Sequence, residues 1–545
     1  MSRRKWYAAV VVIASLAVAG GILTGAGANP PESPDLTSVA TANTRSDGYA
    51  PVGKLSAELQ QVVVAQGSTK FENPSAGVSY YGYDNDVLNA AGEPQMVPTP
   101  TSPTREAHKT EPDKNTYLVF EHGLTGADPN YWYGTHFLFQ GHEGGSPGTI
   151  TRINLDADAA HRVTLLATKD SSGANLATID GVTWEPWAKR LLFTTESSSA
   201  PGVYSATPGY PSTVVDLSGS FGHGAYEGIQ DDSDGNLWIS EDSSGPSKPG
   251  TTAKVPNSFV YRFVPRYRGD LANGKLQVLQ VLNAADQPIT KASQTPLNSP
   301  DQLALHTFGT SFATKWVTIH NTATDGTAVF DANALATAAG GTPFKRPENA
   351  AFRPDKHFRE FYFDETGDTN ATSPENATAG GWCSVFKLTQ KDPSDDTGRL
   401  SIFYKGDQAH AGFDNVTFIS KNQISFVEDA GATLHTQRNA LDSGFVLNVN
   451  LNYANPANQP IRWLAEGRDA SATLDAANGG FGTNEDDNEI TGILVSDGDP
   501  GPDGVLGAKT PKLFKGDWRW FYTQQHGDNP TYQVVPAEGD GPGGS

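Results

Sequence analysis

Acidic residues bracket a pair of short apolar runs in several separate segments of this 545-residue chain. In residues 344–368, Glu348 precedes the first run, a Pro/Asp turn follows, and the second run ends on Asp364 and Glu365. Two short apolar runs around such a turn are typical of a β-hairpin. We call the acid before the first run the opening acid, and the acids that end the second run the closing acids.

This pattern occurs four times with nearly constant spacing, because each opening acid precedes its first closing acid by 14 or 16 residues. The opening acids are Asp180, Glu227, Glu348 and Asp414. The closing acids are Glu196, Glu241 with Asp242, Asp364 with Glu365, and Glu428 with Asp429. A fifth copy opens at Glu489, contains a long acidic insertion, and ends on Gln525 and His526.

The repeat length indicates the fold. The opening positions are separated by 47, 121, 66 and 75 residues, and the step of 121 is about two periods, which predicts a further copy near residues 301–319. Units of roughly 45–75 residues made of strands and turns are typical of propeller blades with four strands each. We therefore predict an all-β fold, a β-propeller with six blades.

A propeller would bring the opening acids together. The innermost strand of each blade faces the central channel, so the same position in each repeat points at the same axis. Two carboxylates about 5 Å apart repel by roughly 3 kcal/mol at an effective dielectric constant near 20. Several converging carboxylates therefore need bound protons or cations, and the repeat predicts a metal-filled channel. The alternative is that these acids only form turns, since Asp bonds its own backbone.

A second group of candidate metal ligands lies near the predicted strands at residues 117–120 and 148–155. These candidates are Glu121, His122, His136, His142 and Glu143. His142 and Glu143 are the best placed, because they lie at the start of a strand pair. The competing interpretation is that each histidine is structural or solvated.

Composition narrows the class of protein. The formal net charge of −22 argues against nucleic acid or an anionic membrane surface as a partner, and it is compatible with cation binding. The single cysteine, Cys383, excludes an intrachain disulfide and a cysteine-based zinc cluster. We expect Cys383 to be a buried and inert thiol.

The chain begins with residues typical of an export signal. Residues 1–28 contain Arg3, Arg4 and Lys5, an apolar run at 8–23, and small residues before the expected cleavage site. The two arginines resemble a twin-arginine signal, although an ordinary secretory signal and an uncleaved anchor are alternatives. We expect a secreted, extracellular protein with no stable membrane insertion after cleavage.

The remaining boundaries follow composition. Residues 29–112 are rich in Pro, Ser and Thr and are predicted to be a linker that wraps the propeller or supplies its closing strand. Residues 113–530 are predicted to form the propeller, and residues 531–545 a flexible tail. The acidic, glycine-rich residues 484–507 are predicted to form a loop whose oxygens suit Ca²⁺, with a solvated loop as the alternative. We expect a monomer.

Several segments in this order resemble the PhoX-type alkaline phosphatase family, in its actinobacterial branch. They are GHEGG with His142 and Glu143, TWEPWAKRLLFTTES at 183–197, AYEGI at 225–229, Arg346-Pro347-Glu348, and VEDAG at 427–431. The resemblance extends over residues 117–526, roughly three quarters of the chain. It implies a six-bladed propeller with calcium and iron ions in its channel, action on phosphate esters, and twin-arginine export.

The resemblance also implies roles for individual residues. Glu196, Glu227, Glu348 and an acid of the group Asp414, Glu428 and Asp429 would hold metal ions. Arg346 would clamp the phosphate and act with Glu348 in catalysis, because a planar guanidinium binds phosphate well. With His142 and Glu143, these residues complete the predicted site.

Two departures from the family pattern bear on the metal. The family's iron-binding cysteine has no counterpart here, since the corresponding segment is Ile179-Asp180-Gly181-Val182. Gly141 replaces the asparagine that precedes His142. Ligands that are oxygen atoms favour Ca²⁺ or another hard cation, so we predict Ca²⁺, and Fe³⁺ is implied by the resemblance alone.

The first functional hypothesis is an exported metal-dependent phosphoric ester hydrolase that acts on a small-molecule phosphate ester. A calcium-dependent lactonase-type propeller is an alternative, which could use Glu227, Asn349 and Asn415. A third hypothesis is a secreted calcium-binding propeller without catalysis, which the missing family cysteine favours.

Overall fold

The computed structural model describes residues 35–47, 52–96, 107–468, 489–525 and 527–537. Ser33–Ser545 form one compact unit. The predicted export signal, part of the acidic loop at 484–507, and His526 lie outside the described residues. Within the described ranges, no helix has both the length and the apolar character needed to cross a membrane.

Among the described residues, most strands fall into six groups of four antiparallel strands, which are consecutive in the chain in all but the sixth group. The first group contains β5 (Pro112–Val119), β6 (His136–His142), β7 (Ile150–Asn154) and β8 (Val163–Ala167). The second contains β9 (Val182–Glu185), β10 (Arg190–Thr194), β11 (Val203–Ala206) and β12 (Val214–Asp216). The third contains β13 (Tyr226–Asp231), β14 (Leu237–Glu241), β15 (Val260–Pro265) and β16 (Gly274–Leu282).

Two of the other three groups include strands from the beginning of the chain. The fourth contains β18 (Ala350–Phe352), β19 (Glu360–Glu365), β20 (Ser384–Gln390) and β21 (Thr397–Lys405). The fifth contains β22 (Phe413–Phe418), β23 (Gln423–Glu428), β24 (Ser443–Asn448) and β25 (Ile461–Ala465), extended by β1 (Lys54–Leu55). The sixth contains β26 (Ile490–Ser496), β27 (Arg519–Gln524), β28 (Thr531–Pro536) and β2 (Leu59–Ala65).

The remaining elements are short and lie in connections. The strands β3 (Val78–Tyr80) and β4 (Tyr83–Asp84) form a separate hairpin. The α-helices are α1 (Ser218–Phe221), α2 (Lys291–Gln294), α3 (Pro300–Leu305), α4 (Thr322–Asp325), α5 (Ala332–Ala338) and α6 (Gly431–Arg438). The 3-10 helices are η1 (Arg45–Asp47), η2 (Ala159–His161) and η3 (Pro502–Gly504).

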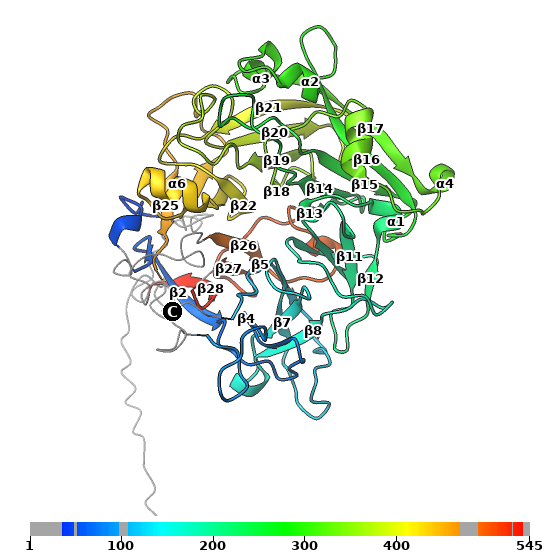
Figure 1. The fold of residues 1–545 in the computed structure, drawn as a ribbon, viewed down its shortest axis with the longest axis vertical. Helices are drawn as coiled ribbons and strands as arrows, with labels where there is room; N and C mark the ends of the chain where they lie inside the picture. Colours follow the sequence, from blue (N-terminus) through cyan, green and yellow to red (C-terminus); the bar gives the residue numbers. More distant parts are fainter. Residues whose placement is uncertain (1–34, 48–51, 97–106, 469–488, 526, 538–545) are drawn as a thin grey trace, which may run out of the picture. The chain divides into compact units, whose positions relative to one another are not determined.

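The six innermost strands form a closed ring. Each contacts the innermost strands on either side, in the order β5, β9, β13, β18, β22, β26 and back to β5 (Figure 1). All six residues of β13 and of β22 are buried, because these strands are covered on both faces. The outer strand β21 instead alternates between buried and more exposed residues. This arrangement is a β-propeller, which confirms the predicted fold class.

Aromatic residues pack the spaces between neighbouring groups. Between the third and fourth groups, the rings of Trp238 and Phe361 have centroids 4.7 Å apart. Between the fifth and sixth, the rings of Trp463 and Trp520 have centroids 4.5 Å apart. Burial of such large apolar side chains stabilises the contacts between sheets that hold the inner strands in a ring.

Strands from the two ends of the described chain complete the sixth group. In the antiparallel pair of β2 and β28, Leu59 faces Pro536 and Ala65 faces Thr531. β28 occupies the first residues of the predicted flexible tail at 531–545, so that boundary differs from the prediction. The segment before the propeller contributes the outermost strand of this group, β2.

The predicted extra copy near residues 301–319 is wrong. These residues belong to α3 and to β17 (Phe312–Asn321), which pairs with both β16 and β21 and so joins the third and fourth groups. The additional group lies instead at the beginning of the ring, in β5–β8. The step of 121 residues is therefore one enlarged repeat, with helices and a bridging strand inserted in its outer part.

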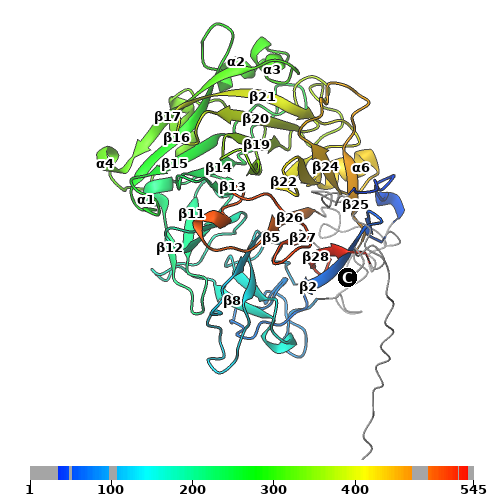
Figure 2. The same ribbon diagram turned by 180° about the vertical axis from the view of Figure 1, so that it is seen from behind.

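The long connection between β26 and β27 lies against the far ends of the inner strands (Figure 2). Val119 N, at the end of β5, donates to Gly498 O at 2.7 Å. The indole nitrogen of Trp184 in β9 donates to Pro500 O at 2.8 Å. We call residues 498–507 the capping segment, because it lies across the ends of β5 and β9.

Candidate metal centre at the propeller axis

Every innermost strand carries an acidic residue at or just before its beginning. These residues are Asp113 in β5, Asp180 before β9, Glu227 in β13, Glu348 before β18, Asp414 in β22 and Glu489 before β26. All six repeats therefore have an opening acid. The copy that the sequence did not reveal begins at Asp113.

Irregular strand pairing accompanies three of these acids. The register shifts between Pro112 and Asn115, between Tyr226 and Ile229, and between Phe413 and Val416. Asp113, Glu227 and Asp414 lie in these intervals. A β-bulge redirects the side chains of the bulged strand, so the irregularity helps the acids to converge.

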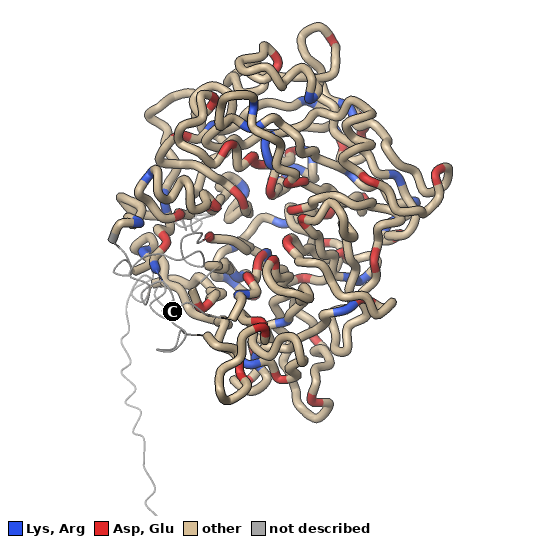
Figure 3. The backbone as a smooth tube through the Cα atoms, viewed as in Figure 1, with Lys and Arg blue, Asp and Glu red and all other residues tan. Residues whose placement is uncertain are grey.

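The acids converge into one cluster. In each of four groups, the carboxylate oxygens that could act as ligands lie within 4.8 Å of one another. The groups are Asp113, Asp180 and Glu227; Asp113, Glu143 and Glu489; Glu143, Asp180 and Glu196; and Glu227, Glu348 and Asp414. Because the groups share members, these eight residues form one continuous set, which we call the carboxylate cluster. Figure 3 shows acidic positions gathered where the inner strands meet.

The carboxylate cluster runs from the protein interior to solvent. Asp113, Asp180, Glu227, Glu348 and Asp414 are buried. Glu143 and Glu489 are partly buried, and Glu196 is exposed. Solvent therefore reaches the cluster on the side of Glu196.

Burial of so many carboxyl groups is unfavourable for their charged forms. It raises the pKa of Asp113 from 3.8 to about 8, and the negative charge of Asp414 adds to this shift. Burial raises the pKa of Asp414 to about 6. Burial and neighbouring charges also raise, well above their ordinary values, the pKa of Glu143, Asp180, Glu227, Glu348 and Glu489.

Buried carboxylate oxygens without hydrogen-bond partners show that cations fit this site. Both Oδ atoms of Asp180, Oε2 of Glu227 and Oδ1 of the neighbouring Asp242 have no partner among the described residues. A buried polar atom without a partner is costly, and a cation would satisfy several at once. The donor set consists of oxygen atoms, which hard cations such as Ca²⁺ prefer.

Two basic side chains accompany the cluster. Lys114 is buried, and its ammonium donates to Asn349 Oδ1. Asn349 Nδ2 in turn donates to Asp414 Oδ1 at 3.2 Å. Burial lowers the pKa of Lys114 despite the opposing effect of nearby carboxylates, beginning with Asp180. Lys114 is thus an internal partner for some of the negative charge.

Arg346 lies at the edge of the cluster. Its Nε donates to Asp242 Oδ2 at 2.8 Å, and its Nη2 lies 3.3 Å from Glu348 Oε1. Burial would lower the pKa of Arg346, but the charges of Asp242 and Glu348 raise it well above the usual value. The side chain remains 19 % exposed. A permanently charged guanidinium therefore stands beside the carboxylates and within reach of solvent.

Three predicted ligands lie outside the four groups. His142 has both ring nitrogens in contacts of 2.9 Å, with Thr110 Oγ1 and Thr151 Oγ1, and burial lowers its pKa to about 3. Glu428 accepts from Ala411 N at 2.9 Å and pairs with Arg438 at 3.1 Å. Asp429 is closer to the cluster, since its charge contributes to the raised pKa of Glu489.

The other candidates have separate surroundings. Glu121 and His122 line an open cavity of about 810 Å³ that shares no residue with the carboxylate cluster. His136 pairs with Asp156 at 2.9 Å. The thiol of Cys383 is buried, and Sγ donates to His410 O at 3.5 Å. In the described part of the predicted calcium loop, Asp497 and Asp499 both pair with Lys509, at 2.9 and 2.7 Å.

Sequence reasoning omitted three members of the cluster as metal ligands. Asp180 and Glu489 were recognised as opening acids but not proposed as ligands. Asp113 was not recognised as an opening acid, because it precedes Glu143 by 30 residues. In the four recognised copies, the opening acid precedes the first closing acid by only 14 or 16 residues. A rule that ignores loop length and asks for an acid before each buried strand would have found all three.

Comparisons with known proteins bear on this arrangement. The sequence profile of the family described as Alkaline phosphatase PhoX matches residues 219–500, more than half of the chain. No curated protein sequence matches. Among solved structures, an auxiliary nutrient binding protein from Bacteroides thetaiotaomicron is similar over 85 % of this chain and 86 % of that one, with 10 % identity and a TM-score of 0.34. A streptogramin B lyase is similar over 78 % of this chain and 98 % of that one, with 9 % identity and a TM-score of 0.31.

Fold and site together define a β-propeller with a cluster of carboxylates and an arginine at its axis. The chain belongs to the PhoX alkaline phosphatase family. Membership supports a phosphatase-type hydrolase of a metal-dependent family, and it suggests phosphate esters as the class of substrate. The predicted family is thereby confirmed.

Proposed function

We propose that the protein is an exported, metal-dependent phosphoric ester hydrolase whose carboxylate cluster holds the cations and whose Arg346 binds the phosphoryl group. The observation that carries this proposal is the set of buried, unpartnered carboxylate oxygens beside a charged guanidinium. The matched family supports the reaction class. Cations bound there would polarise the phosphoryl oxygens and lower the pKa of a bound water.

Arg346 is suited to bind a phosphoryl group. Asp242 and Glu348 engage Nε and Nη2, which fixes the plane of the guanidinium and leaves Nη1 for a phosphoryl oxygen. The positive charge would stabilise the negative charge that the phosphoryl oxygens carry as the ester bond breaks. The partial exposure of the side chain gives an ester access to it.

Glu348 has two functions in the proposal. Its Oε1 accepts a hydrogen bond from Thr366 Oγ1 and lies beside Arg346 Nη2, so the carboxylate orients the arginine. It also belongs to the group with Glu227 and Asp414, where it would help to hold a cation. The proposed ligands are therefore the eight members of the carboxylate cluster, with Asp429 nearby.

Calcium is the proposed ion, because the donor set consists of carboxylate oxygens. The family's cysteine has no counterpart, and the thiol of Cys383 is not part of the four groups, so these residues offer no thiolate for iron. Export through residues 1–28, an extracellular location and a monomeric state complete the proposal.

The test is hydrolysis of an aryl phosphate by the purified protein. The protein is first treated with a chelator and then assayed with and without added Ca²⁺, while elemental analysis records the bound metals. We expect activity to disappear on chelation and to return with Ca²⁺. Hydrolysis of a lactone but not of the phosphate would favour the lactonase alternative. Stabilisation by Ca²⁺ without turnover of either substrate would favour the calcium-binding alternative.

A further inference from the structure

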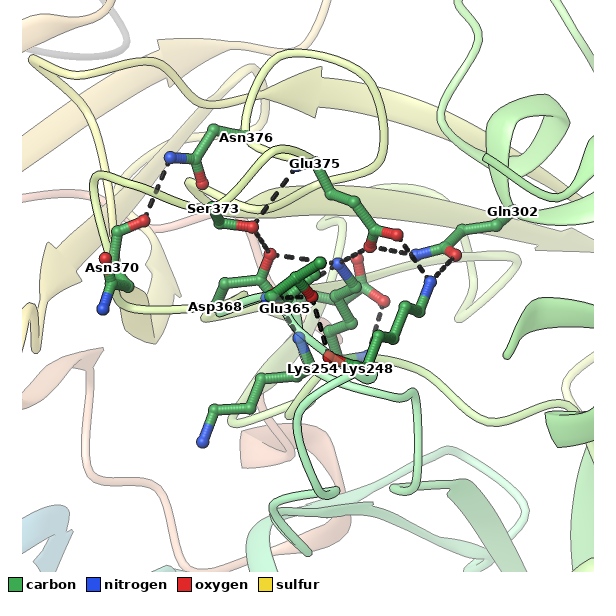
Figure 4. Close-up of polar contacts among 12 residues, drawn as sticks. Lys248, Lys254, Gln302, Glu365, Asp368, Asn370, Ser373, Glu375 and Asn376 are labelled. Atoms are coloured by element: carbon green, nitrogen blue, oxygen red, sulfur yellow. Dashed lines mark hydrogen bonds and ion pairs between the residues drawn. The ribbon is translucent and has the colours of Figure 1, made fainter. Parts of the chain in front are cut away.

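A second set of buried polar residues includes Lys345, which precedes Arg346 in the chain. It consists of the charged residues Lys248, Lys345, Asp368 and Glu375 and the neutral Gln302, and we call it the lysine network. Figure 4 shows Lys248, Gln302 and Glu375 pointing toward one another from separate parts of the chain. All five residues are buried. The proposed phosphate and metal contacts involve none of them.

The charges in the lysine network are paired. Lys345 Nζ lies 3.1 Å from Asp368 Oδ1 and 2.5 Å from Glu375 Oε2. Lys248 Nζ lies 2.6 Å from Glu375 Oε1 and also donates to Gln302 Oε1. Gln302 Nε2 donates to Glu375 Oε2 at 2.7 Å. Burial would raise the pKa of Glu375, but the lysines, Lys345 first, lower it below its usual value.

The backbone around Lys345 is held as firmly as its side chain. Lys345 N donates to Glu365 Oε1 at 2.8 Å, and Gly367 N donates to Lys345 O at 3.2 Å. Glu365 is held in turn by His306, whose Nε2 lies 3.0 Å from Glu365 Oε2. Lys345 is therefore fixed through its amide, its carbonyl and its ammonium group.

The next residue has an unusual backbone conformation. Arg346 has a φ of +61°, in the left-handed region that non-glycine residues seldom adopt. It also precedes Pro347, and a residue before proline normally prefers an extended backbone. Such a conformation persists where the surrounding structure fixes it, and here Thr366 N donates to Arg346 O at 2.9 Å.

We infer that Lys345 is a positioning residue: the lysine network holds the segment before Arg346 so that this arginine keeps its left-handed backbone and its guanidinium stays between Asp242 and Glu348. This inference rests on the proposed role of Arg346 in binding phosphate. Buried ion pairs contribute little net stability compared with apolar residues of similar volume, so orientation of a neighbour is a better reason for this network than stability.

The test is a double-mutant cycle on the metal-loaded protein, with an aryl phosphate as substrate. The variants are Lys345→Met, Arg346→Ala and the double variant, and kcat, KM and the inhibition constant of inorganic phosphate are measured for each. We expect Lys345→Met to lower kcat by about 10- to 100-fold and to weaken phosphate inhibition, since the arginine is present but misplaced. The double variant should be no slower than Arg346→Ala, because Lys345 acts through Arg346.

Other results would contradict the inference in distinct ways. If the two losses multiply in the double variant, or if Lys345→Met lowers Tm and leaves kcat unchanged, Lys345 does not position Arg346. If Arg346→Ala retains full activity, the proposed role of the arginine fails first, and the positioning role fails with it.

Two further variants separate positioning from folding. Lys248→Met removes a lysine that contacts Glu375 and Gln302 but not Asp368, so it should lower Tm comparably and reduce kcat less than Lys345→Met does. Glu375→Gln keeps the size of the side chain and serves if Lys345→Met does not fold. When Glu375→Gln is combined with Arg346→Ala, the double variant should have a kcat no lower than that of Arg346→Ala alone. If the two losses of kcat multiply instead, the inference is rejected.

Discussion

The carboxylate cluster and the lysine network are two sets of buried charges joined by the short segment 345–348, yet they differ in balance. In the lysine network, Lys248 and Lys345 face Glu375 and Asp368 at 2.5–3.1 Å. In the cluster, eight carboxylates have Lys114 and Arg346 as basic neighbours, and several oxygens have no partner within the described ranges. Burial alone therefore does not mark a site.

The difference lies in where the positive charge comes from. The lysine network contains its own positive charges, the ammonium groups of Lys248 and Lys345, so its charges are paired when the chain folds. In the proposed function, ions from solution complete the carboxylate cluster, and without them its acids keep protons, as the raised pKa values of Asp113 and Asp414 indicate. The four predictions that follow test this contrast, beginning with the largest expected effect.

Removal of metal should have the largest effect on activity. We expect a chelator to reduce aryl phosphate hydrolysis by at least about 1,000-fold, because bound ions supply most of the stabilisation of charge in such sites. Steady-state rates before chelation, after chelation, and after addition of Ca²⁺ measure the effect. Undiminished hydrolysis by protein shown to be free of metal would remove the basis for treating the cluster as a metal centre.

Arg346→Ala should lower kcat by about 100- to 1,000-fold, since it removes a fixed donor to the phosphoryl group. Because the side chain of Arg346 is partly exposed, its replacement should not unfold the protein. The matched control is Arg268→Ala, which removes an exposed arginine that pairs with Asp234. A loss of kcat in the control as large as in Arg346→Ala would mean that the effect is not specific to the site.

The metal-free protein should lose stability as pH rises. In the folded state the pKa of Asp113 is about 8 and that of Asp414 about 6, and both are near 4 in the unfolded chain. The folded state thus binds protons more tightly, so this contribution is present below about pH 4 and lost as pH rises through 8. Thermal unfolding between about pH 5 and pH 8 should show a falling Tm with chelator and a flatter profile with Ca²⁺. Identical profiles would show that the ions do not neutralise these carboxylates.

The smallest effect on metal content is expected from His142→Gln. Both ring nitrogens of His142 contact threonine hydroxyls, so this change should leave the bound metal unaltered and cost about 1–2 kcal/mol of stability through lost hydrogen bonds. Glu227→Gln is the comparison. Glu227 belongs to two of the four groups, so this substitution should reduce the metal content. Loss of metal in the histidine variant would restore His142 as a ligand.

The sequence predicts the part of this structure that repeats. A carboxylate before each pair of buried strands indicated the propeller and brought Glu227, Glu348 and Asp414 into one site. These residues have equivalent positions in equivalent strands, so their convergence follows from the fold itself. Arg346 was predicted from the family resemblance, because no arginine recurs at the equivalent position of the other repeats.

The parts that do not repeat could not be predicted. The repeat that begins with Asp113 was hidden by the long connection between β5 and β6, and the insertion that contains β17 was mistaken for another repeat. The lysine network has no sequence signature, because Lys248, Gln302 and Glu375 come from three connections that only the folded chain brings together. Side-chain partners of this kind depend on tertiary structure rather than on local spacing.

The capping segment covers part of one end of the propeller axis. Because residues 498–507 lie across the ends of β5 and β9, and Glu196 is the exposed member of the carboxylate cluster, we expect a ligand to approach the carboxylates from the side of Glu196 and to withdraw by the same route. A dead-end passage of this kind accepts the tip of a molecule rather than its middle, so we expect terminal phosphate groups to be preferred over internal diesters. It also means that a departing phosphate and an arriving ester compete for one path, which would make the product a competitive inhibitor.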